Sequence, residues 1–147
     1  MTEADRMDRR EDGAFGYDYR RECRCGFDDA VASVEAALGR HGFSVSAMHD
    51  IQAVLAAKGF KIQPIRIYEV MGHGAPAGHS DGQGEEGESR LARLMPCRIN
   101  VFAEDEAVVV TVLRPTLLCR VFPEDDLTEL AAALERVLVA VVDDAAD

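Results

Sequence analysis

The stretch Leu94-Met95-Pro96-Cys97-Arg98-Ile99-Asn100-Val101-Phe102 decides the fold of this chain. Proline has no N–H and a fixed φ, so Pro96 suits the first position of a strand rather than its middle. Residues 99–103 and 107–114 then predict a β-hairpin, with residues 103–106 at its turn. Short connections of this kind predict antiparallel pairing, with Cys97 at the border of the sheet.

The residues before this hairpin predict three further strands and two helices. Three arginines make the strand over 17–25 a candidate for the edge of the sheet. Apolar residues at helical spacing predict a helix over 29–41, with Asp28 as its N-cap and Gly42 at its C-terminal stop. The remaining elements are a strand over 43–48, a short helix over 51–57 and a strand over 65–71.

A long amphipathic helix follows the hairpin. Pro123 suits its first turn, where residues 124–126 bring negative charge to the positive end of the helix dipole. An apolar stripe from Leu127 to Val141 predicts that this helix faces a sheet. The order of elements predicts an α+β domain with a mainly antiparallel sheet and helices packed on one of its faces.

The length of 147 residues suits one domain, which we expect over residues 17–142. Residues 1–16 are charged and lack apolar periodicity, which predicts a disordered tail, and residues 143–147 predict an acidic tail. Residues 72–89 are rich in glycine and acidic side chains and include His73 and His79. They predict a mobile loop within the domain.

The composition excludes several classes of protein. The net charge of −11, with no basic stripe, disfavours nucleic-acid binding. No apolar run reaches the roughly 18 residues that span a membrane, and residues 1–16 lack a signal peptide's apolar centre. We therefore expect a cytosolic protein with reduced cysteines. Only two of the 16 basic residues are lysines, Lys58 and Lys61, which we interpret as genomic composition or adaptation to salt.

Several short segments resemble the bacterial and archaeal family called domain of unknown function 302. The resemblance covers residues 17–142 and implies a two-layer β-α-β4-α domain of the TATA-binding-protein-like type, commonly a homodimer. It implies no activity. Family members often carry Cys-Asn-Pro at the end of the third strand, where this chain has Met71-Gly72-His73. The segments that carry the resemblance are Phe27-Asp28-Asp29-Ala30, Gly42-Phe43, Lys58-Gly59, Tyr68-Glu69-Val70 and Leu94-Met95-Pro96-Cys97-Arg98.

Cys97 is the main candidate for a functional thiol. It can be a buried small hydrophobe, or a reactive thiol if a neighbour such as Arg98 lowers its pKa. It can also be a ligand for a soft metal, Cu(I) or Zn(II), together with Met95, Met71, His73 or His79, although the spacing matches no standard zinc motif. Apart from this metal, we predict no cofactor.

Two weaker candidates lie elsewhere. Cys23 and Cys25 form a CxC pair whose thiols can bridge a metal ion or oxidise, or which is a coincidence on an exposed edge. His49 precedes Asp50, but we expect Asp50 to cap a turn rather than to share acid–base work with its neighbour. Cys119 lies in an apolar stretch and is expected to serve packing.

No phosphate-binding loop, dinucleotide fingerprint, nucleophile elbow or zinc-protease motif occurs in the sequence. Their absence favours a role other than catalysis. We expect a homodimeric module that binds a small ligand or a protein partner, but not nucleic acid or a membrane. The alternative is a thiol-dependent protein centred on Cys97 that handles sulfur, senses redox state or binds a soft metal.

Overall fold

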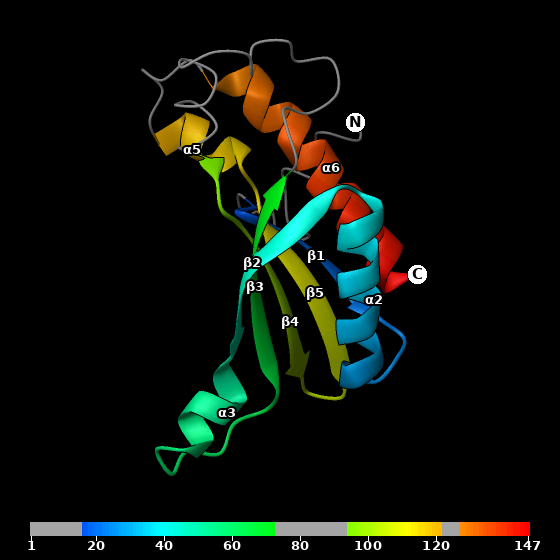
Figure 1. Cartoon of the computed structure of the whole chain (residues 1–147), viewed down its shortest axis with the longest axis vertical. Coiled ribbons are helices and arrows are strands. Elements are labelled where there is room, and N and C mark those ends of the chain that lie inside the picture. The colour runs from blue at the N-terminus through cyan, green and yellow to red at the C-terminus, as the bar shows by residue number, and fades with distance from the viewer. Residues whose placement is uncertain (1–15, 73–93, 122–126) are drawn as a thin grey trace.

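Five antiparallel strands form one sheet, and two long helices lie on the same side of it (Figure 1). The computed structural model describes residues 16–72, 94–121 and 127–147. The strand order β1-β5-β4-β3-β2 puts β4 at the centre of the sheet. The strands are β1 (Asp18–Cys23), β2 (Phe43–Asp50), β3 (Ile65–Gly72), β4 (Cys97–Glu104) and β5 (Ala107–Leu113), and the helices are α2 (Phe27–Arg40), α3 (Ile51–Ala56), α5 (Thr116–Val121) and α6 (Thr128–Ala146).

The architecture confirms the predicted α+β class and the predicted hairpin. β4 and β5 pair antiparallel from Ile99 opposite Val112 to Glu104 opposite Ala107. Asp105 in the turn has a φ of 55°, a conformation that aspartate tolerates better than most residues. β4 begins at Cys97, two residues earlier than residue 99, because Cys97 already pairs with Val70 of β3.

Side-chain alternation separates the sheet into a covered face and an open face. Successive residues of a strand point to opposite faces, so Cys97, Ile99 and Val101 all point to the helices, and all three are buried. The helices contribute Leu38 of α2 and Leu138 of α6, which are 1% and 0% exposed. The covered face therefore holds the core, and the intervening residues of β4 form part of the open face.

Two tyrosines of the covered face fasten the sheet to the helices. The hydroxyl of Tyr68 on β3 donates to Oε1 of Glu35 on α2 at 3.0 Å. The hydroxyl of Tyr19 on β1 donates to Oδ1 of Asp143 on α6 at 2.6 Å. Arg21 also donates to Asp143, at 2.9 Å. These bonds satisfy polar groups that the packing would otherwise isolate from water.

A buried ion pair joins the other end of the sheet to α6. Arg114, which follows β5, donates to Glu135 at 3.4 Å and to the backbone oxygen of Gly16 at 3.1 Å. The second carboxylate oxygen of Glu135 accepts from the hydroxyl of Thr116 at 2.7 Å. Both charged side chains are almost fully buried, so each depends on the other for compensation.

The boundaries of two helices differ from the prediction. The N-cap of α2 is Gly26 rather than Asp28, because Ala30 N–H donates to the carbonyl of Gly26 at 2.9 Å. Asp28 lies instead in the first turn, where the helix dipole favours its charge. Leu127 is the N-cap of α6 and is buried in the core, as its place in the predicted stripe requires. Residues 122–126, with the predicted start at Pro123, lie outside the described residues.

One helix was missed and one segment was wrongly predicted. Residues 116–121, for which no element was predicted, form α5, which is too short to show helical periodicity in the sequence. The predicted acidic tail is wrong for residues 143–146, which continue α6. Carboxylates are unfavourable at a helix C-terminus, but Arg40 of α2 pairs with Asp144 at 3.0 Å and lowers the pKa of its carboxyl group. Residues 1–15 and 73–89 of the predicted tail and loop lie outside the described residues.

The buried ion pair gives a test of the fold. Glu135→Ala leaves the charge of Arg114 buried without its carboxylate, so we expect the free energy of unfolding to fall by about 3–5 kcal/mol. Urea denaturation measures the change. Glu129→Ala, at an exposed position of the same helix, should change the free energy of unfolding by less than about 0.5 kcal/mol. Equal effects of the two substitutions would contradict the role of the pair.

Candidate functional site

Cys97 lies in the core at the first position of β4. It is 6% exposed, and its thiol donates to the carbonyl of Leu94 at 3.4 Å and lies 3.8 Å from the sulfur of Met95. Burial raises the pKa of the Cys97 thiol to about 12. Arg98 points to the opposite face by strand alternation, so it does not offset this burial. The surroundings of Cys97 therefore favour a neutral thiol over a thiolate.

Of the predicted metal ligands within the described residues, the structure places Met95 beside Cys97, with 3.8 Å between the two sulfurs, but not Met71. Met71 opposes Ser44 and is one residue beyond Val70, the partner of Cys97, so it points to the open face. His73 and His79 lie outside the described residues. Within residues 16–72, 94–121 and 127–147, no group of three or more His, Cys, Asp and Glu side chains is placed to hold a metal ion.

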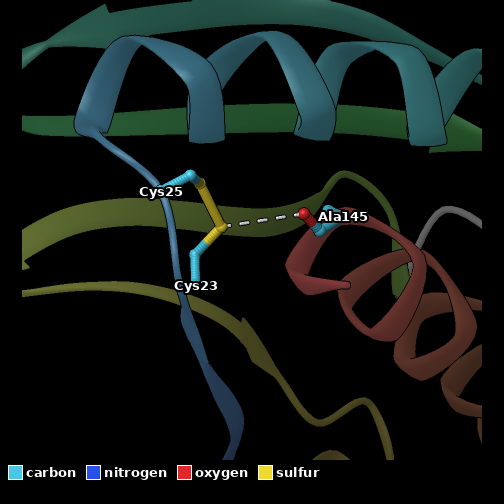
Figure 2. Close-up of a disulfide and its surroundings, with 3 residues drawn as sticks. All are labelled: Cys23, Cys25 and Ala145. Atoms are coloured by element: carbon cyan, nitrogen blue, oxygen red, sulfur yellow. Dashed lines mark hydrogen bonds between the residues drawn. A yellow bond between two sulfur atoms is a disulfide. The ribbon is translucent and has the colours of Figure 1, made fainter.

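Cys23 and Cys25 form a disulfide at the end of β1 (Figure 2). Their Cα atoms are 5.4 Å apart, within the range that a disulfide can join. The expectation of reduced cysteines is wrong for this pair in the structure, and Cys23 is buried rather than on an exposed surface. Cys119 is a free thiol, partly buried against the core as predicted.

His49 and Asp50 have separate roles, as their adjacency predicts. Asp50 is the N-cap of α3, and its carboxylate accepts from the N–H of Ala53 at 2.9 Å. His49 contacts Glu69 of the neighbouring strand, with 3.2 Å between Nε2 and Oε2. This pair lies on the open face of the sheet and is half-exposed. Among the residues that the structure describes, no third side chain bonds to this pair to complete an acid–base set.

The open face carries a hollow beside the β4–β5 turn. Its volume is about 380 Å³, within the range of small-molecule sites. Arg20 and Glu104 form an ion pair at 3.0 Å among its lining residues. The other three acidic residues of the lining have no ion-pair partner among the described residues. We call this feature the acidic hollow; its acidic residues are Glu22, Glu104, Asp105 and Glu106, beside Arg20 and Val109.

Residues 50–64, here called the α3 arm, extend beyond the end of the sheet where the β4–β5 turn lies (Figure 1). A backbone hydrogen bond within the arm ends α3: Phe60 N–H donates to the carbonyl of Leu55 at 2.9 Å. Gly59 has the positive φ of 89° that such a helix end requires. No residue of α3 is buried. Val54 and Phe60 are 52% and 61% exposed.

Neither the α3 arm nor the acidic hollow was predicted to be a functional feature. Their strongest signal was Lys58 and Lys61, the only lysines of the chain, which both lie in the arm beside Phe60. We interpreted them as compositional bias. The acidic residues of the hollow come from two strands and one turn, and no local pattern could bring Glu22 beside the consecutive residues 104–106.

The geometry defines a small α+β domain with one open sheet face. A family model described as "Domain of unknown function DUF302" matches residues 19–145, and the chain belongs to this family. A crystal structure of an uncharacterised conserved DUF302 protein from Bacillus stearothermophilus is similar, with a TM-score of 0.70 and 22% sequence identity. The match covers 88% of this chain and 98% of that one, and at this identity it shows the fold. A search of curated proteins gives no match.

Among the described residues, no helix combines the length and the apolar character that crossing a membrane requires.

The buried thiol of Cys97 predicts a specific pH dependence of stability. An unfolded cysteine loses its proton near pH 8.5, at about its ordinary pKa. The native thiol keeps its proton up to about pH 12, so the contribution of Cys97 to stability is complete below the unfolded pKa and is lost as pH rises. Between pH 8 and pH 10, wild type should lose about 2 kcal/mol more stability than Cys97→Ala.

Urea denaturation of both proteins at the two pH values measures this difference. Cys119→Ala is the matched control, because its thiol is only partly buried and should change the slope less. Parallel pH dependences of wild type and Cys97→Ala would contradict a buried, protonated Cys97.

Proposed function

We propose that this protein is a homodimeric binding module in which the α3 arm of each subunit docks into the acidic hollow of the other. The observation that supports it most is that α3 has no buried residue. Isolated helices of this length are marginal in water, and helices in proteins depend on the packing of an apolar face. Within its own chain α3 buries this face only in part, at Ile51 and Leu55, so we propose that a partner supplies the remaining packing.

Exposed apolar side chains give the arm its binding potential. Covering a side chain such as Phe60 stabilises a complex by about 1.5–3 kcal/mol. Aromatic residues are also enriched among the few interface positions that dominate affinity. Val54, at 52% exposed, adds a second apolar anchor on the arm.

Complementary charge between the arm and the acidic hollow favours a second copy of the chain as the partner. The α3 arm contains two lysines and one acidic residue, Asp50, which caps α3, although the whole chain has a net charge of −11. The acidic hollow offers Glu22, Asp105 and Glu106 to such a segment. In a twofold dimer each contact is repeated by symmetry. The arm of each subunit therefore meets the acidic hollow of the other, and the dimer contains two such contacts.

The thiol-dependent alternative centred on Cys97 has weaker support. Cys97 is buried, its pKa is raised to about 12, and among the described ligand candidates Met95 lies beside it but Met71 does not. Access to its sulfur would need part of the core to open. We therefore assign binding, rather than thiol chemistry at Cys97, as the proposed function.

Phe60→Asp tests the proposal by placing a negative charge where the arm would meet the acidic hollow. We expect the dissociation constant of the dimer to rise roughly 30-fold or more, as for an aromatic anchor worth about 2 kcal/mol. Sedimentation velocity over a range of concentrations measures it. Val121→Asp is the control, because Val121 is 58% exposed but lies on α5 at the other end of the molecule (Figure 1). A monomeric wild type, or a dimer that Phe60→Asp leaves intact, would contradict the proposal.

A charge exchange tests which surface receives the arm. Lys61→Glu and Glu106→Lys should each weaken the dimer, since each places like charges at the contact. The double variant should recover a large part of the wild-type affinity. Additive loss in the double variant would show that the arm docks elsewhere, on another surface or another partner.

A further inference from the structure

The disulfide between Cys23 and Cys25 spans a single residue, Arg24. A cross-link stabilises a fold mainly by restricting the unfolded chain, and the restriction grows with the length of the closed loop. A loop this short gives little of that benefit. β1 is also already held by its antiparallel pairing with β5, up to Cys23 opposite Val108. The bridge therefore adds little to the stability of the fold. Redox chemistry explains a disulfide at this position better than stabilisation does.

The two sulfurs have different surroundings. Cys23 is 8% exposed, and its Sγ lies 3.9 Å from the carbonyl oxygen of Ala145 in the last turn of α6 (Figure 2). Carbonyls of a last helical turn have no donor within the helix, so this oxygen is available to a Cys23 thiol. Cys25 is only partly buried and precedes Gly26, the N-cap of α2. One cysteine is thus shielded with an acceptor for its proton, and the other is open to a reactant.

The start of α2 also favours a sulfur anion near Cys25. No side chain caps the first N–H groups of this 14-residue helix, and the helix dipole is positive at that end. The positive charge of Arg24 lies between the two cysteines, and the carboxylates of Asp28 and Asp29 follow in the first turn and oppose it. The helix dipole and Arg24 therefore favour a thiolate at Cys25, and the carboxylates of Asp28 and Asp29 offset part of this effect.

We infer that Cys23 and Cys25 form a redox-active pair that exchanges electrons with dithiols. A thiolate of the dithiol attacks Sγ of Cys25, forms a mixed disulfide with it and breaks the bond to Cys23. Cys23 leaves as a thiolate and takes a proton, and its thiol then faces the Ala145 carbonyl. The second thiolate of the dithiol then attacks the first dithiol sulfur, which is bonded to Cys25 in the mixed disulfide. Cys25 leaves as a thiolate and takes a proton. Two electrons and two protons pass from the dithiol to the pair, which is reduced as the dithiol becomes a disulfide.

This inference is independent of dimerisation, since the sulfurs face the helices and the acidic hollow is on the open face. It also differs from chemistry at Cys97, which remains a buried thiol throughout.

The first experiment uses the native wild-type chain and dithiothreitol as the dithiol. Air-equilibrated protein is treated with dithiothreitol without denaturant and freed of it, all free thiols are then blocked as the chain is unfolded, and mass spectrometry counts the blocked groups. We expect two thiols before treatment, Cys97 and Cys119, and four after it, at dithiothreitol concentrations that do not unfold the protein. A pair that is already reduced in air, or that resists reduction until the chain unfolds, would overturn the inference.

The second experiment compares single-cysteine variants. Cys23→Ser leaves Cys25 to react, and Cys25→Ser leaves Cys23. With oxidised glutathione as the probe, the variant that retains Cys25 should form the mixed disulfide at least tenfold faster. The change Cys119→Ser is added to both variants, so that the only thiols are buried Cys97, common to both, and either Cys25 or Cys23. Equal rates, or faster reaction of Cys23, would overturn the assignment of Cys25 as the attacked sulfur.

Discussion

The burial of one sheet face beneath α2 and α6 is the constraint on which the rest of the structure depends. Because strand side chains alternate, each residue is committed either to that core or to the open face. Cys97 falls on the buried side and Arg98 on the open side. The same constraint that makes the fold predictable therefore removes Cys97 from solvent and separates it from Arg98, which could activate it, and from Met71, which could share a metal with it.

Much of the fold could be predicted, because apolar periodicity reports directly on burial against the covered face. The hairpin of β4 and β5 and the helix α2 follow from it. The exposed arm could not be predicted in this way, since Val54 and Phe60 resemble core residues in any local pattern. The acidic hollow depends on strand order, which brings Glu22 beside Glu104 although they are far apart in the sequence.

The CxC pair shows where local spacing is ambiguous. Two cysteines on one side of a strand can bridge a metal, oxidise or pack, and the choice depends on what lies against them. Here Ala145 of α6 lies against Cys23, a contact across the chain that no spacing could reveal. Glu22 lines the acidic hollow and Cys23 follows it on the other face, so the two proposed functions adjoin at the end of β1. They stand on different observations, and either can fail alone.

The central claim is that a second copy of the chain covers the α3 arm. Hydrogen exchange of the backbone amides at 53–60 and 104–107, measured across a range of protein concentrations, tests it most directly. The account predicts that exchange of both segments slows together as concentration rises, because the arm and the acidic hollow become buried in the same step. Exchange that is independent of concentration in both segments, or slowing confined to other parts of the chain, would contradict it.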